Sequence, residues 1–164
     1  MRLHHAALGH VTLARRGESL ITDSVLAAAF PRPPLHVHPG QSERFEVQGG
    51  RLRVTVGGAD VVLGAGDALT VPAGTPHTFA VEGAEPVRLR ATFDPAGQLE
   101  RFFAGLHRLA ERGHIDARGR PRSLAVAPFA LAHLDEFRLA RVPAWLQQTV
   151  LATLVRVSRH PRAG

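Results

Sequence analysis

Cysteine and lysine are both absent from this chain of 164 residues. Without cysteine there is no disulfide framework and no thiolate metal site, so any bound metal must be held by nitrogen and oxygen donors. No apolar run reaches membrane-spanning length, and residues 1–10 lack the apolar core of a signal peptide. We therefore expect a cytoplasmic location and no membrane partner, and the missing cysteine agrees with that expectation.

Because lysine is missing, all 20 basic residues are arginine, and the net charge is +6 at pH 7. Such a balance can indicate a polyanionic partner such as nucleic acid. The arginines are scattered, however, and the densest basic segment, residues 112–122, has no aromatic side chain that would stack on bases. A preference for arginine over lysine explains the charge, and nucleic acid is not an expected partner.

The first half of the chain has the pattern of a β-protein. With 45% hydrophobic residues, the chain can form one domain with its own core. Between residues 44 and 93, short segments alternate apolar and polar side chains and are separated by turn signals such as Gly57-Gly58. Many short strands with no helix between them predict a sandwich or barrel. The alternation in residues 87–93 predicts that Arg88 and Arg90 face outward.

After residue 93 the apolar period becomes helical. Asp94 and Pro95 resemble an N-cap followed by a proline in the first helical turn, which predicts that a helix starts there. A second apolar segment covers residues 123–139, and Pro143 is predicted to open a last helix. Within these elements, Phe137 is interpreted as a packing residue.

Four side chains could together hold a metal ion. His36 and His38 are two residues apart, so on a strand both imidazoles leave the same face, roughly 6.6 Å apart. A Pro-Gly turn then lets the chain fold back, which brings Glu43 toward them. A later strand and turn end in a single histidine, His77. Imidazoles and a carboxylate that converge in this way suit a divalent transition metal.

These segments resemble the two sequence motifs of the cupin family. The first motif has the form HxH, four residues, Glu, six residues, Gly, and is matched by His36, His38, Glu43 and Gly50. The second has the form Gly, five residues, PxG, two residues, His, and is matched by Gly66, Pro72, Gly74 and His77. The chain departs from the motifs at Phe30, where Gly is usual, and at Val81, where Asn is usual. Neither position is a family metal ligand, so the departures concern only turn geometry and pocket lining.

The resemblance, which covers about residues 18 to 93, implies a mainly β fold. It is the cupin double-stranded β-helix, a jelly-roll barrel, here followed by C-terminal α-helices. The expected division is a barrel of residues 1–93 and a helical extension of residues 94–164. The helices are expected to pack on the outside of the barrel, to cover its mouth or to form a subunit interface. A homodimer is expected, as is common for the family.

The resemblance also implies the roles of individual residues. His36, His38, Glu43 and His77 would bind one divalent transition metal, for which Fe, Mn, Ni, Cu, Co and Zn all remain candidates. Glu43 is predicted to be catalytic as well, as a carboxylate that can leave the metal and accept a proton. The residues predicted to contact a small-molecule substrate lie beside the ligands and are Gln41, Phe45, Val47 and Phe79.

The sequence leaves several functions open. The first is a metal-dependent, oxygenase-like enzyme that acts on a small organic substrate at a site of three histidines and one glutamate. The second is a non-catalytic cupin that binds a metal or small ligand as a sensor or store. Metal-dependent isomerases and decarboxylases of the same fold are further alternatives. A regulator with a DNA-binding helix-turn-helix ranks last, because long links separate the helical segments and Pro128 interrupts the middle one.

Overall fold

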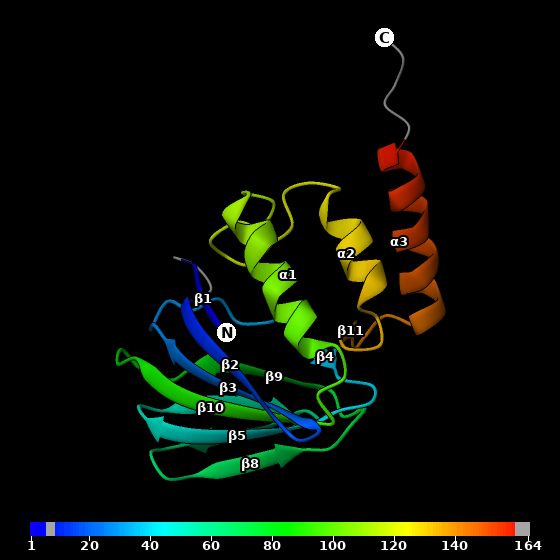
Figure 1. Cartoon of the computed structure of the whole chain (residues 1–164). Coiled ribbons are helices and arrows are strands. Elements are labelled where there is room, and N and C mark those ends of the chain that lie inside the picture. Colours follow the sequence, from blue (N-terminus) through cyan, green and yellow to red (C-terminus); the bar gives the residue numbers. More distant parts are fainter. Residues whose placement is uncertain (6–8, 160–164) are drawn as a thin grey trace.

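A computed structural model describes residues 1–5 and 9–159, which form two antiparallel sheets with three helices gathered on one side of them (Figure 1). The six-stranded sheet has the order β1 (Arg2–His5), β2 (Gly9–Arg16), β3 (Ser19–Leu26), β10 (Val87–Asp94), β5 (Ser42–Gly49) and β8 (Ala68–Val71). The five-stranded sheet has the order β11 (Arg138–Leu139), β4 (His36–Val37), β9 (His77–Val81), β6 (Leu52–Val56) and β7 (Ala59–Leu63). The mainly β fold with helices after the barrel is the predicted fold class.

The main hydrophobic core lies between the two sheets. Phe45 and Leu89 of the six-stranded sheet meet Leu52 and Val54 of the five-stranded sheet, and all four are buried. Successive side chains of a strand point to opposite faces, so each strand contributes every second residue to this core. On β10 the apolar positions are buried while Arg88 is exposed, so its predicted outward direction is confirmed.

Three helices follow the barrel: α1 (Leu99–Glu111), α2 (Val126–Ala132) and α3 (Ala144–Arg159). Leu99 and Phe102 of α1 join a second core cluster with Phe93 at the end of β10. Pro143 directly precedes α3, so the prediction that it opens the last helix is confirmed.

The predicted helix start at Asp94 is wrong. Asp94 is the last residue of β10 and pairs with Ser42 across the sheet. Its carboxylate accepts a hydrogen bond from the Ser19 hydroxyl at 3.1 Å, so it connects two strands instead of capping a helix. The first helix begins at Leu99. A long-range side-chain bond therefore outweighed a local capping signal.

The helical extension also contributes to the barrel itself. Arg138 and Leu139 of β11 pair with Val37 and His36 of β4, which adds an edge strand to the five-stranded sheet. The division of the chain at residue 93 stays a prediction. Within the described residues, no helix combines the length and the apolar character needed to cross a membrane.

Two motif glycines offer a matched test of why glycine stands there. Gly50 has φ +77°, and a Cβ at this position would collide with the carbonyl oxygen of Pro86. Gly74 has a similar φ of +73°, but a Cβ added there would have no neighbouring atom within 4 Å. Gly74→Ala should therefore cost about 1–2 kcal/mol of stability, for the left-handed backbone alone. Gly50→Ala should cost about 1–3 kcal/mol more, because of the collision. Urea unfolding of both variants measures the two losses of stability. Equal losses would mean that a collision with Pro86 is not the reason for glycine at position 50.

Candidate metal centre

The four predicted ligands meet at one end of the barrel, although they come from separate hairpins. His36 on β4 is the strand partner of His77 on β9, and Glu43 lies at the start of β5 in the opposite sheet. One ligand atom from each of His36, His38, Glu43 and His77 lies within 4.8 Å of the other three. All four residues are buried. The geometry predicted from the sequence is therefore present.

Glu43 lies at the centre of the group. Its Oε2 atom is 2.8 Å from Nε2 of His77 and 3.4 Å from Nε2 of His38. The His36 ring lies beside both other imidazoles, with ring centroids 4.3 Å from His77 and 5.1 Å from His38. Three ring nitrogens and a carboxylate in such close contact form a donor set for a borderline transition metal.

Each imidazole is oriented by a backbone carbonyl. Nδ1 of His36 lies 2.8 Å from the carbonyl oxygen of Pro34, and Nδ1 of His77 lies 2.8 Å from that of Thr75. Nδ1 of His38 has the same kind of partner, the carbonyl oxygen of Glu136. A histidine that donates its Nδ1–H to a carbonyl directs Nε2 toward the metal site, and Nε2 can bind a metal once it has lost its own proton. The residues present therefore fit a metal ion held through Nε2 atoms.

The mutual contacts of these groups shift their pKa values. Burial, reinforced by the neighbouring imidazoles of His77 and His38, lowers the pKa of His36 to about 3. Burial would raise the pKa of Glu43, but hydrogen bonds from His38 and His77 outweigh it and lower the pKa to about 2. Burial would lower the pKa of His77, yet its hydrogen bond to the Glu43 carboxylate raises it above the usual 6.5. In the metal-free protein, Glu43 is thus ionised at neutral pH.

The raised pKa of His77 predicts how metal binding depends on pH. Below that pKa the imidazole carries a proton that a metal must displace, because only the neutral form is a ligand. The apparent affinity for Zn²⁺ should therefore rise with pH through 6.5 and above, with protons released on binding. Calorimetric titration in two buffers of different ionisation enthalpy counts these protons. A Zn²⁺ affinity that does not change between about pH 6 and about pH 8 would contradict the assignment of His77 as a ligand that must lose a proton.

A short segment of the helical extension lies against two of the predicted ligands, His36 and His38. We call residues 136–140 the strap. The Phe137 ring in the strap stacks on the His36 ring, with centroids 4.5 Å apart and planes 17° from parallel. Next to it, β11 pairs with β4, and the amide of Ala140 donates to the carbonyl of Leu35 at 3.0 Å. The strap therefore lies directly against β4 and the His36 ring. Phe137 is a packing residue, as interpreted, and it packs on a predicted ligand.

The four predicted substrate contacts lie in different surroundings. Phe45 and Val47 are part of the main core, and Phe45 is fully buried. Phe79 is partly buried and stacks with Phe30 at a centroid distance of 6.1 Å. Gln41 is buried near the ligands, and its Oε1 has no hydrogen-bond partner among the described residues. Contact with a substrate stays a prediction for all four, and Gln41 has the free polar atom that such a contact needs.

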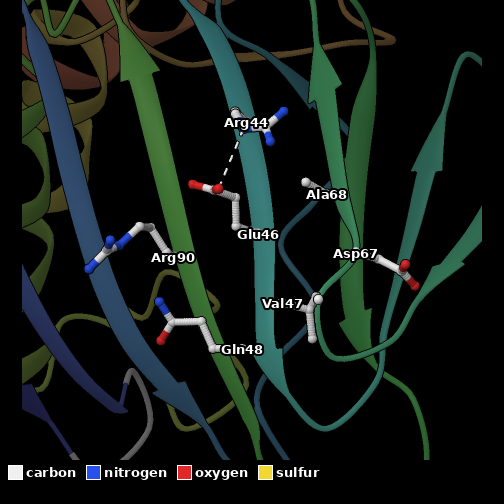
Figure 2. Close-up of a pocket in the computed structure, with 8 residues that line it drawn as sticks. Arg44, Glu46, Val47, Gln48, Asp67, Ala68 and Arg90 are labelled. Atoms are coloured by element: carbon white, nitrogen blue, oxygen red, sulfur yellow. Dashed lines mark ion pairs between the residues drawn. The ribbon is translucent and has the colours of Figure 1, made fainter.

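Two surface hollows of the barrel have none of the four predicted ligands in their lining. Figure 2 shows one of about 390 Å³ on the outer face of β5, where Arg44 and Glu46 form an ion pair of 3.6 Å. These two side chains alternate along the strand with the inward-facing Glu43 and Phe45. A second hollow, of about 490 Å³, is lined by Thr55 and by neighbours of two ligands in the sequence, Leu35 before His36 and Thr78 after His77. Neither hollow includes a ligand.

The fold and the site define a small jelly-roll barrel with a buried group of three histidines and one glutamate suited to a divalent metal. Residues 24–93 match the family model described as a cupin domain. This part of the chain is a cupin domain, and it contains all four predicted ligands.

Known proteins resemble the chain in part. A segment of 49 residues is 41% identical to quercetin 2,3-dioxygenase of Bacillus subtilis (strain 168), and it spans 30% of this chain and only 14% of that enzyme. The structure of KdgF from Halomonas sp. has a TM-score of 0.54 at 16% identity, over 61% of this chain and 92% of that one. An RmlC-like cupin from Shewanella frigidimarina NCIMB 400 has a TM-score of 0.53 at 22% identity, over 61% of this chain and 87% of that one. At such identities the two structures support the fold alone.

Proposed function

We propose that the chain is a metal-dependent cupin enzyme of the oxygenase type, acting on a small organic substrate. The metal would be held by His36, His38, Glu43 and His77. The observation that carries the proposal is the buried convergence of these four donors from both sheets. The partial likeness to a dioxygenase supports the reaction class, although it covers a small share of that enzyme.

The chain's own residues would prepare the site in three ways. Carbonyl groups orient the imidazoles so that their Nε2 atoms face one point. Apolar neighbours such as Phe45 and Phe93 keep water away from the ligands, which strengthens electrostatic interactions there. Glu43 would take a proton from a substrate only when it is free of the metal and of the imidazoles that lower its pKa. The bound metal would supply Lewis acidity, and a redox-active one would also supply electron transfer.

One observation favours a non-catalytic metal-binding cupin as a second candidate. His36, His38, Glu43 and His77 are each at most 4% exposed, and the strap lies against His36 and His38. A site that must admit a substrate needs an open coordination position with access from outside. A sensor or a storage protein needs the ion to be held and has no such requirement.

The two candidates are distinguished by metal analysis followed by oxygen uptake. The recombinant protein is loaded separately with Fe²⁺, Mn²⁺, Ni²⁺, Co²⁺, Cu²⁺ and Zn²⁺, and bound metal is measured per chain. Oxygen consumption is then followed with a panel of small diketones and phenols, with Zn²⁺-loaded protein as the redox-inactive control. About one metal per chain with uptake for a redox-active ion supports the enzyme. One metal per chain with no uptake for any compound supports the second candidate.

The homodimer and the cytoplasmic location stay predictions. The homodimer is supported by an exposed apolar face on α3, which includes Leu146, Val150 and Val157. Exposed apolar side chains that cluster on one helix commonly mark a protein interface.

A further inference from the structure

One of the three orienting carbonyls comes from outside the barrel. Pro34 and Thr75 each lie two residues before the histidine that they orient, so the local backbone supplies these carbonyls. The carbonyl that orients His38 belongs to Glu136 in the strap, 98 residues further along the chain. His38 therefore depends for its orientation on whether the strap is docked.

In addition to its pairing with β4, the strap is bonded to one buried side chain of α3. Oε1 of Gln147 accepts a hydrogen bond from the amide of Leu139 at 3.0 Å. Nε2 of the same residue donates to the carbonyl oxygens of Leu139 at 3.0 Å and Val142 at 2.7 Å. Gln147 is buried, whereas its neighbour Gln148 is exposed. A single amide group thus fixes the backbone on the far side of the strap from the ligands.

We propose that Gln147 is a positioning residue of the metal centre, acting through the strap. It fixes the strap, and the docked strap presents the Glu136 carbonyl that keeps Nε2 of His38 directed at the metal. Metal binding and strap docking are then coupled, so each favours the other. The inference rests on the metal-binding part of the proposed function and requires no particular reaction.

Metal binding and strap docking are coupled because the His38 Nδ1–H has its hydrogen-bond partner in the strap. His38 is buried, so when the strap undocks this donor loses its carbonyl and the ring is free to turn or change tautomer. Groups that orient a metal-ligating histidine in this way typically contribute 10–100-fold to metal affinity. His36 and His77 keep their own local carbonyls, so the effect is confined to one ligand.

The test compares Gln147→Met with Gln148→Met, using Zn²⁺ as the probe. Methionine preserves the length and bulk of glutamine but makes none of the three amide contacts. Three quantities are measured on the full chain: the rate of Zn²⁺ loss to a chelator, the hydrogen exchange of the strap amides, and the solvent exchange of the three imidazole Nδ1–H protons by NMR. Gln147→Glu is a second variant that retains the acceptor for Leu139 but places a carboxylate against two carbonyls.

We expect Gln147→Met to lose Zn²⁺ about 10–100-fold faster than the wild type, and Gln148→Met to behave as the wild type does. The His38 Nδ1–H should exchange faster, while those of His36 and His77 remain protected. In the wild type, Zn²⁺ should slow the exchange of the Ala140 amide. Should Gln147→Met fail to fold, the same pattern is expected from Gln147→Glu.

Two outcomes would overturn the inference. One is that Gln147→Met and Gln148→Met lose Zn²⁺ at equal rates, although the strap amides of Gln147→Met exchange faster than those of the wild type. The other is a similar change at all three imidazoles, which indicates general loosening of the barrel. Failure of the wild type to retain Zn²⁺ would overturn the metal-binding proposal as well. Retention of Zn²⁺ with equal rates would remove only the role of Gln147.

Discussion

Replacing His38 with alanine should lower the affinity for Zn²⁺ by more than about 100-fold, beyond the loss typical of an orienting group. The variant removes an Nε2 donor 3.4 Å from Glu43 Oε2, and it leaves the Glu136 carbonyl without its partner. Competition with a chromogenic chelator at neutral pH measures the affinity. Metal analysis after gel filtration should find far less than one Zn²⁺ per chain.

His114→Ala is the matched control for this variant. His114 is bonded through its Nδ1 to the Ser123 hydroxyl at 2.8 Å and is not among the four grouped ligands. Its replacement should leave the metal content unchanged. Full metal stoichiometry in the His38 variant would mean that the ligands have been assigned wrongly.

Replacing Phe45 with alanine should destabilise the metal-free protein by about 3–5 kcal/mol. The Phe45 ring is fully buried in the main core and meets Phe79 edge-on at a centroid distance of 5.5 Å. Its removal leaves a cavity that the surrounding strands fill only partly. Urea unfolding followed by circular dichroism measures the change.

Phe45→Leu separates packing from a role in substrate binding. Leucine retains most of the apolar volume, so its cost should be well below that of alanine. A loss below about 1 kcal/mol for Phe45→Ala would place the ring beside open space, as its predicted contact with a substrate requires.

The ligand set could be predicted because its positions follow local rules. The two-residue spacing of His36 and His38 sets the direction of both rings once they lie on a strand. The turn before Glu43 and the turn before His77 are marked by glycine and proline. The structure brings all four together, as the spacing predicted.

The strap could not be predicted, for two physical reasons. Its contact with His38 uses a backbone carbonyl, which every residue carries, so Glu136 has no distinguishing sequence signal. The surrounding residues 123–139 are apolar enough to be interpreted as helix, but α2 ends at Ala132 and β11 follows. The wrong helix start at Asp94 has a related origin, since its partner Ser19 lies 75 residues away.

The carbonyl at residue 136 has a consequence for the order in which the chain is synthesised. When the ribosome has added residue 77, all four predicted ligands are part of the nascent chain. The strap, with the carbonyl that orients His38, is synthesised only later. An ion captured by the nascent chain would meet two fixed imidazoles and one that still turns freely. Residues 24–93 contain all four predicted ligands but lack the carbonyl that orients His38.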